Sequence, residues 1–294
     1  MRMLVTGQEG QVARSLAERA PAGAIELVAL GRPELDLAGA PEAIVAATKA
    51  ARPDIIVSAA AYTAVDRAES ESELAFAVNE QGPKAIADAA AELGVPLIHL
   101  STDYVFDGTK ISPYVEDDAT GPTGIYGASK LAGEQAVLAG HSDSVVLRTA
   151  WVYSPFGANF VKTMLRLAGE RDEIAVVSDQ RGNPTSALDI ADAIFAVARN
   201  LLADDNPALR GVFHTTGAGD ASWAEFAEGI FAASADRGGP TARVRHIATA
   251  DYPTPARRPA NSRMDCSKLA SVHAVKLPDW RDSIGDVVGG LLAH

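Results

Sequence analysis

The hydrophobic and polar positions in the first half of the chain follow two alternating patterns. Short runs of β-branched and apolar residues, such as RMLVTG and DIIVSAAA, predict buried strands, and each is followed by apolar positions at helical spacing. The predicted strands cover residues 2–7, 25–31, 54–61, 95–102 and 144–153. The predicted helices cover residues 11–20, 41–51, 71–94 and a segment starting near 125, and Pro83 is expected to kink or divide the third.

Apolar strands that alternate with helices indicate a parallel sheet covered on both faces. The predicted fold class is therefore α/β, a doubly wound, Rossmann-type parallel sheet with a smaller, mixed α/β lobe. We expect residues 1–150 to form a dinucleotide-binding domain and residues 151–294 to form mainly a substrate-binding lobe, with 187–215 returning to the main sheet. The less regular second half predicts helices at 159–170, 187–203, 222–235 and 279–294, a strand at 173–179 and a Pro/Arg-rich loop at 251–263.

Composition narrows the kind of partner. A hydrophobic fraction of 47% over 294 residues is typical of a folded soluble protein, and the net charge of −12 argues against a nucleic-acid binder. The chain has no apolar run long enough for a membrane span, and its start does not read as a signal peptide. The single cysteine, Cys266, suits a reducing cytoplasm. These features favour a cytoplasmic protein with a small-molecule ligand.

The segment VTGQEGQVA joins the first predicted strand to the first helix. Gly7 and Gly10 are three residues apart, and Ala13 takes a third small position. Gly7 would allow a tight turn and Gly10 a close approach of the backbone to a pyrophosphate, which the helix N-terminus would face. The alternative is a tight strand-to-helix turn without a ligand. The position of this glycine loop at the first strand–helix junction favours dinucleotide binding over that alternative.

The end of the second strand is expected to select the nicotinamide cofactor. An acidic residue there would bind a ribose 2′-hydroxyl, whereas an arginine would accept a 2′-phosphate. Arg32 stands at the tip of this strand, and Asp36 comes later, where it would meet the adenine. The pattern favours NADPH, with NADH also accepted; the alternative for Arg32 is a solvated loop residue.

The pair Tyr126 and Lys130 lies four residues apart in IYGASKLAGE, so both side chains share one helix face. The fourth strand ends in Ser101, Thr102 and Asp103. Taken alone, Tyr126 and Lys130 could be two ordinary helix residues, and Ser101 and Thr102 could simply cap the strand end. These alternatives are weaker when the pair and the strand end are considered as one group. Together the pair and the strand end predict a carbonyl reductase site, because Lys130 would lower the pKa of Tyr126, Thr102 would bind the substrate oxygen and Tyr126 would protonate it.

With the motifs TGQEGQV, STDYVFDG, YGASKLAGE, LRTAWVY and YPTPARRPANSRMD, the chain resembles the dTDP-4-dehydrorhamnose reductase family of extended short-chain dehydrogenase/reductases. The resemblance implies NAD(P)H-dependent reduction of the 4-keto group of dTDP-4-dehydro-L-rhamnose, for cell-surface polysaccharide synthesis. It implies a catalytic set of Tyr126, Lys130 and Thr102. The implied cofactor-binding residues are Gly7, Gly10, Gln11, Val12, Arg32, Asp36, Leu37, Ala59, Ala60, Ala61, Tyr62, Thr63, Leu100, Ser101, Tyr126 and Lys130. The implied substrate-binding residues are Val65, Thr102, Asp103, Tyr104, Trp151, Asn159, Arg257 and Arg258.

Several points stay open at this stage. Arg257 and Arg258 either bind the substrate diphosphate or pair with carboxylates. Some family members hold a divalent ion at a dimer contact on the first helix, but Ser15 stands here where an acid is wanted, so we expect no metal, and magnesium has no support from the sequence. The protein is expected to be a monomer or homodimer. Rival functions are a nucleotide-sugar epimerase or dehydratase, and a non-catalytic NADP-binding regulatory subunit resembling that of methionine adenosyltransferase.

Overall fold

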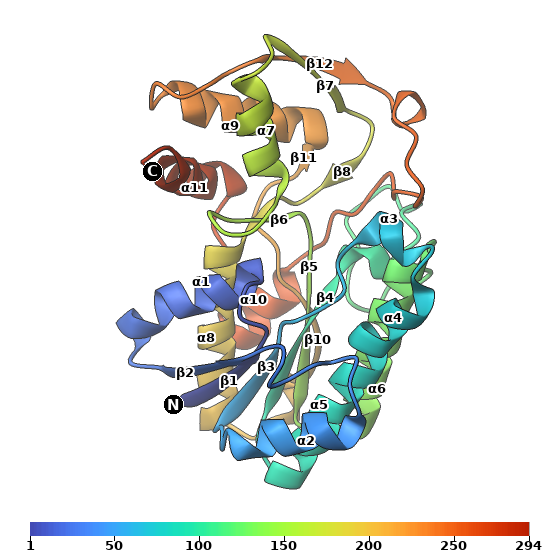
Figure 1. Ribbon diagram of the computed structural model, residues 1–294, viewed down its shortest axis with the longest axis vertical. Coiled ribbons are helices and arrows are strands. Elements are labelled where there is room, and N and C mark those ends of the chain that lie inside the picture. The colour runs from blue at the N-terminus through green and yellow to red at the C-terminus, as the bar shows by residue number, and fades with distance from the viewer. Residues whose placement is uncertain (294) are drawn as a thin grey trace.

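The computed structural model describes residues 1–293, and a parallel six-stranded sheet forms its centre (Figure 1). Every neighbouring pair in this sheet is parallel, as predicted for a doubly wound fold. Across the sheet the strands lie in the order β10 (Gly211–His214), β5 (Ser144–Thr149), β4 (Leu97–Thr102), β3 (Ile55–Ser58), β1 (Arg2–Thr6) and β2 (Glu26–Leu30). Strand β2 is added on one side of β1, and β3, β4, β5 and β10 are added on the other side. The order of the strands therefore reverses between β1 and β3, and sheets of this type bind ligands at such a point.

Helices cover both faces of the sheet because alternate strand residues point to opposite sides. On one face Met3, Val5 and Val57 pack with α1 (Gln11–Arg19), α8 (Ala187–Ala203) and α10 (Ser267–His273). On the other face Leu4 and Ile56 pack with α2 (Pro41–Ala50), α5 (Gly82–Leu93) and α6 (Ile125–Gly140). Helix α8 and strand β10 thus lie with the main sheet, although they follow the first substrate-lobe elements along the chain.

The helical stretch predicted at 71–94 is divided, as Pro83 suggested. It consists of α4 (Ser72–Phe76), a π-helical turn η2 (Ala77–Gln81) and α5, and it follows the short helix α3 (Val65–Ala68). Pro83 lies in the first turn of α5 and has no N–H to bond back to the π-helical turn that precedes it. The turn η2 brings the Asn79 carbonyl so close to α6 that a Cβ on Gly133 would lie 2.0 Å from it. Gly133 therefore lets the Tyr126 helix approach this turn.

The strand predicted at 144–153 is wrong in its last part. Strand β5 ends at Thr149, and Trp151 has a φ of +47°, a conformation that few residues other than glycine adopt. The chain leaves the main sheet at this residue, and β6 (Val152–Tyr153) pairs instead with β9 (Thr185–Ser186). Hydrophobic pattern does not reveal such a turn, because Ala150 and Trp151 are as apolar as the strand before them.

The smaller lobe lies beyond this turn, at the top of Figure 1. Its core includes Tyr153, Phe226 and Trp280, which are all buried. The lobe contains α7 (Phe160–Ala168), α9 (Trp223–Ala235), α11 (Trp280–Leu292), β7 (Glu173–Val177), β8 (Arg181–Gly182), β11 (Ala221–Ser222) and β12 (Arg243–Ile247). Strand β12, which the pattern did not predict, pairs in parallel with β7. Short 3-10 turns complete the fold at η1 (Ala20–Gly23), η3 (Asp103–Val105), η4 (Pro207–Leu209) and η5 (Thr249–Asp251).

Over the residues that the structure describes, no helix combines the length and the apolar character that crossing a bilayer requires.

Candidate active site

A cavity of about 1100 Å³ opens at the carboxyl ends of the central strands. Its walls come from the ends of β1, β2, β3 and β4, from α6 and from the turn after β5. Most of the predicted site residues line it: Gly7, Gly10, Gln11, Val12, Arg32, Asp36, Leu37, Ala59, Ala60, Ala61, Tyr62, Thr63, Val65, Leu100, Ser101, Thr102, Asp103, Tyr104, Tyr126, Lys130 and Trp151. One continuous space therefore reaches from the glycine loop to the Tyr126 helix.

The glycine loop after β1 makes a tight turn beside the end of β3 and leaves open space at Gly10. Gly7 has a φ of +91°, and an added Cβ would lie 3.2 Å from that of Ala60, so only glycine fits without strain. The hydroxyl of Thr6 accepts hydrogen bonds from the backbone N–H groups of Ala59 and Ala60, at 3.0 Å each, and so ties the ends of β1 and β3 together. A Cβ on Gly10 would meet no atom within 4 Å, so the cavity is open at this point.

The first turn of α1 faces this open space. Gly10 is its N-cap and no side chain of the described residues caps it, so the first N–H groups and the positive end of the helix dipole are free to bind an anion. The side chain of Gln11 points elsewhere: its Oε1 accepts from Ser154 Oγ at 2.8 Å and from Asn159 Nδ2 at 3.0 Å. Gln11 thus offers its backbone to the cavity while its amide joins α1 to the smaller lobe.

Arg32 and Asp36 line the same cavity after β2, and their side chains differ in availability. Arg32 is exposed and forms no ion pair with any described residue. Asp36 Oδ1 accepts from the backbone N–H of Ala38 at 3.0 Å and so shapes its own turn. Arg32 is therefore the side chain that can meet a phosphate at this end of the cavity.

The predicted catalytic group lies at the opposite end, mostly shielded from water. Thr102 and Lys130 are 6% and 3% exposed. Lys130 Nζ donates to the carbonyl of Leu100 at 2.6 Å and lies 3.5 Å from Nε2 of the buried His99. Burial lowers the pKa of Lys130 to about 8, although Glu134 acts in the opposite direction. Lys130 thus carries an ammonium whose protonation changes near neutral pH.

The pKa of Tyr126 differs from the prediction. Burial raises it above the ordinary value, the charge of Asp103 raises it further, and a hydrogen bond with Thr102 opposes both. The prediction that Lys130 lowers this pKa is wrong for the geometry observed, because the ammonium is bonded to Leu100 and burial is the larger effect. The phenol therefore stays protonated at neutral pH, and its raised pKa makes it a weaker acid than an exposed tyrosine.

Asp103 stands behind Thr102 and is 2% exposed. The Thr102 hydroxyl donates to Asp103 Oδ1 at 2.8 Å, whereas Oδ2 is buried with no partner at hydrogen-bond distance among the described residues. Burial raises the pKa of Asp103 to about 6, with Thr102, Ser262 and backbone N–H groups in opposition. The sequence identified Asp103 as a site residue but gave no sign of this burial.

Aromatic rings form the wall next to this group. Trp151 stacks on Trp223 with ring centroids 3.6 Å apart and planes at 8°, and the ring of Tyr104 meets that of Tyr126 edge-on at 5.4 Å. Trp151 lines the cavity and is supported by Trp223 of the smaller lobe. Such a flat apolar surface can pack against a sugar ring.

Three of the predicted substrate residues do not line the cavity. Asn159 caps α7 by accepting from the Lys162 N–H at 3.1 Å, and its amide group donates to Gln11 and to nearby carbonyls. Arg258 Nη2 pairs with Asp66 Oδ2 at 2.7 Å, whereas Arg257 is exposed. The Arg258 pair corresponds to the alternative interpretation, except that its partner lies in α3, outside the smaller lobe.

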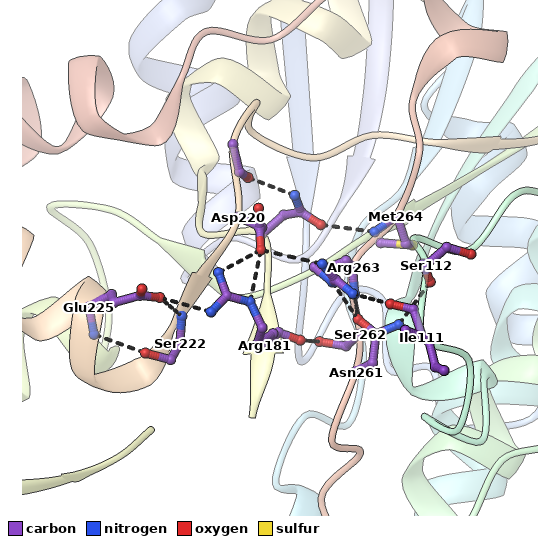
Figure 2. A network of polar contacts seen from close by, with 12 residues as sticks. Ile111, Ser112, Arg181, Asp220, Ser222, Glu225, Asn261, Ser262, Arg263 and Met264 are labelled. Carbon is purple, nitrogen blue, oxygen red and sulfur yellow. Dashed lines mark hydrogen bonds and ion pairs between the residues drawn. The ribbon is translucent and has the colours of Figure 1, made fainter. Parts of the chain in front are cut away.

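A polar network connects the smaller lobe to the loop that follows β4 (Figure 2). Arg181 of β8 bonds to Asp220 at 2.8 Å and pairs with Glu225 of α9 at 3.3 Å, and its carbonyl accepts from the Ser262 N–H at 2.8 Å. Asn261 donates to the carbonyls of Lys110 and Ser112, at 2.7 and 3.0 Å. The sequence did not reveal this network, which sets Ser262 beside Asp103, because its members are far apart along the chain.

No metal centre is built by residues 1–293: no group of three or more His, Cys, Asp or Glu side chains is placed to hold an ion. Ser15, which stands where the metal site of some family members needs an acid, is fully buried and faces the core.

The fold and the site together define an extended short-chain dehydrogenase/reductase, with a glycine loop after β1, a hydroxyl at the end of β4 and a Tyr-x-x-x-Lys pair on α6. Within this class, the chain belongs to the family described as RmlD substrate binding domain, whose model matches residues 1–292.

Named relatives agree with this family. The chain is 52% identical over 292 residues to a dTDP-4-dehydrorhamnose reductase of Sinorhizobium fredii, covering 99% of this chain and 98% of that protein. A crystal structure of a dTDP-4-dehydrorhamnose reductase from Clostridium acetobutylicum superimposes with a TM-score of 0.92 at 34% identity, covering 100% of both chains. The Bacillus anthracis enzyme of the same name, in complex with NADP, has a TM-score of 0.89 at 34% identity over 97% of this chain and 98% of its own.

Proposed function

We propose that the protein reduces the 4-keto group of dTDP-4-dehydro-L-rhamnose to a hydroxyl with NADPH, giving dTDP-L-rhamnose for cell-surface polysaccharide synthesis. The observation that carries this proposal is the single cavity that joins the glycine loop to Thr102, Tyr126 and Lys130. The names of the relatives support the substrate, and the NADP complex of the Bacillus anthracis enzyme supports the cofactor.

The protein's own groups divide the work between the two ends of the cavity. The backbone at Gly7 and Gly10 and the first turn of α1 bind the pyrophosphate, and Arg32 binds the 2′-phosphate. Bound NADPH supplies the hydride. Lys130 binds the nicotinamide ribose and adds positive charge beside the reacting oxygen.

At the substrate end, Thr102 donates a hydrogen bond to the carbonyl oxygen and Tyr126 transfers its phenolic proton to that oxygen. Trp151 packs against the sugar ring. NADH can use all of these contacts except that with Arg32, so we propose that it is accepted with weaker binding.

Rival functions are less well supported by the residues at the end of β4. Dehydratases that resemble this fold carry Thr-Asp-Glu there, with the acids moving protons, whereas here Tyr104 follows Asp103. A non-catalytic binding subunit would not require a complete set of Thr102, Tyr126 and Lys130.

One assay separates these functions. The protein is mixed with NADPH and freshly made dTDP-4-dehydro-L-rhamnose, and absorbance of the reduced nicotinamide is followed. A reductase consumes NADPH in proportion to the substrate supplied. Tight NAD with no net consumption would indicate an epimerase or dehydratase, and cofactor binding without turnover on any nucleotide sugar would indicate a regulatory subunit.

A further inference from the structure

The hydrogen bonds of Thr102 conflict with the task assigned to it. A threonine hydroxyl has one proton to donate and two lone pairs to accept with. Thr102 donates its proton to Asp103 Oδ1 at 2.8 Å and accepts from the Tyr104 N–H at 3.3 Å. At most one lone pair remains, which can accept from the Tyr126 phenol, and a substrate carbonyl oxygen is itself an acceptor. While Thr102 donates to an ionised Asp103, it has no proton for the substrate.

Asp103 is an unusual acceptor, because it has no cation partner among the described residues. Two phenols face it: Tyr126 from α6, and Tyr104 from its own 3-10 turn. The charged groups beyond Tyr104 are Arg258 and Asp66, which pair with each other. The carboxyl is buried, Oδ2 has no partner at hydrogen-bond distance, and burial raises the pKa to about 6. A protonated Asp103 is therefore accessible near neutral pH.

We propose that Asp103 is a positioning residue, and that Thr102 donates to the substrate oxygen only while Asp103 carries a proton. Protonated Asp103 donates to Thr102 Oγ1, which then accepts from Asp103 and Tyr104 and turns its own proton towards the carbonyl. Every donor and acceptor of Thr102 is then used. No proton leaves Asp103 in this step, and Tyr126 remains the group that protonates the substrate. The inference rests on the proposed ketone reduction.

The smaller lobe takes part through Ser262. The backbone N–H and the hydroxyl of Ser262 both donate to the Arg181 carbonyl, at 2.8 and 3.3 Å, inside the network of Figure 2. The dipole of this hydroxyl opposes the rise that burial causes in the pKa of Asp103. Removing this hydroxyl is expected to make Asp103 hold its proton to higher pH without changing Asp103 itself.

The experiment measures the single-turnover rate of NADPH oxidation between about pH 5.5 and 8.5 for five proteins: wild type, Asp103→Asn, Asp103→Ala, Ser262→Ala and Asp117→Asn. In the wild type we expect a limb that falls by up to about tenfold per pH unit as Asp103 ionises. Asp103→Asn and Asp103→Ala lack this limb, since neither can form a carboxylate that captures the Thr102 proton. In Ser262→Ala the limb moves to higher pH.

Asp117→Asn is the matched control, because it removes an exposed carboxylate from a nearby loop and should follow the wild type. Any fall caused by Lys130, whose pKa is about 8, occurs in all five proteins. Three results would overturn the inference. The first is a wild-type profile without the limb, and the second is a limb retained in both Asp103 variants. The third is loss of the reaction at every pH in Asp103 variants that fold and bind NADPH. If the Asp103 variants do not fold, an unmoved limb in Ser262→Ala overturns it. If no protein consumes NADPH, wild type included, the proposed reaction itself fails.

Discussion

The two ends of the candidate site differ in the groups that they present to the cavity. At the cofactor end, Gly7 and Gly10 present backbone, and Arg32 is exposed. At the catalytic end, Asp103 and Lys130 are ionisable and almost fully buried. The first end contributes shape and hydrogen-bond donors, whereas the second contributes protonation states that burial shifts. Substitutions at the cofactor end should therefore change cofactor binding, or the stability where the backbone is strained as at Gly7, and those at the catalytic end should change the reaction or the stability.

The largest effect is expected at Tyr126. Tyr126→Phe removes the proton donor and should lower kcat by about 100- to 10,000-fold, the usual contribution of a general acid. The Kd for NADPH should stay within about twofold, which corresponds to a change in binding free energy of well under 1 kcal/mol. Single-turnover kinetics and a fluorescence titration measure the two quantities. Tyr252→Phe, which alters an exposed phenol, is the control, and near-normal turnover by Tyr126→Phe would mean that another group is the acid.

The next effect concerns stability at the catalytic end. Burial raises the pKa of Asp103 from 3.8 to about 6, so the folded state binds its proton more tightly than the unfolded state. The stability linked to this proton is complete below about pH 4 and is lost as the pH rises through about 6. Asp103→Asn should therefore be more stable than the wild type by about 2–3 kcal/mol at about pH 8.

Urea unfolding at several pH values measures this difference, which should shrink as the pH falls towards about 4. Asp117→Asn should show no such gain. A stability difference for Asp103→Asn that does not depend on pH would contradict the assigned cause.

At the cofactor end, Gly10→Ala should weaken NADPH binding without weakening the fold. The added methyl group meets no protein atom within 4 Å, but it would occupy space at the proposed pyrophosphate site. We expect the Kd to rise by about tenfold, or about 1.4 kcal/mol, with an unchanged Tm. Gly7→Ala should instead lower the Tm, because of the φ of +91°, and Gly140→Ala should change neither quantity. A Gly10→Ala protein that binds NADPH normally would place the pyrophosphate elsewhere.

The smallest effect is expected at Arg32. An exposed ion pair contributes up to about 1 kcal/mol, so Arg32→Ala should raise the KM for NADPH roughly fivefold. The KM for NADH is the internal control and should hardly change. Equal effects on the two cofactors would remove the assignment of Arg32 to the 2′-phosphate, and adding salt should reduce the difference for the wild type.

Sequence patterns predicted local features well. The strand-to-helix order, the position of Tyr126 and Lys130 on one helix and the division near Pro83 all depend on residues close together along the chain. The turn at Trp151 was not predictable, since a positive φ at a bulky residue leaves no trace in the hydrophobic pattern.

Side-chain partners across long separations were equally hidden. Asn159 faces Gln11, Arg258 faces Asp66, and His99 lies beneath Lys130, and each contact needs the folded chain to exist. The pKa of Asp103 depends on the same packing. Residue types and spacings therefore identified many of the residues that line the cavity, while their chemical state followed only from burial.

The stacked indoles of Trp151 and Trp223 give the molecule a built-in optical reporter. Trp151 lies just after β5 of the main sheet, and Trp223 is the first residue of α9 in the smaller lobe. The contact between their rings, with centroids 3.6 Å apart, therefore spans the two lobes. Two chromophores this close exchange excitation energy, and their near-ultraviolet circular dichroism and emission depend on how the rings are aligned. The chain has three tryptophans, and Trp151 of this pair lines the cavity. Any tilt of one lobe against the other, or a sugar laid on the free face of Trp151, should therefore be visible without an added label.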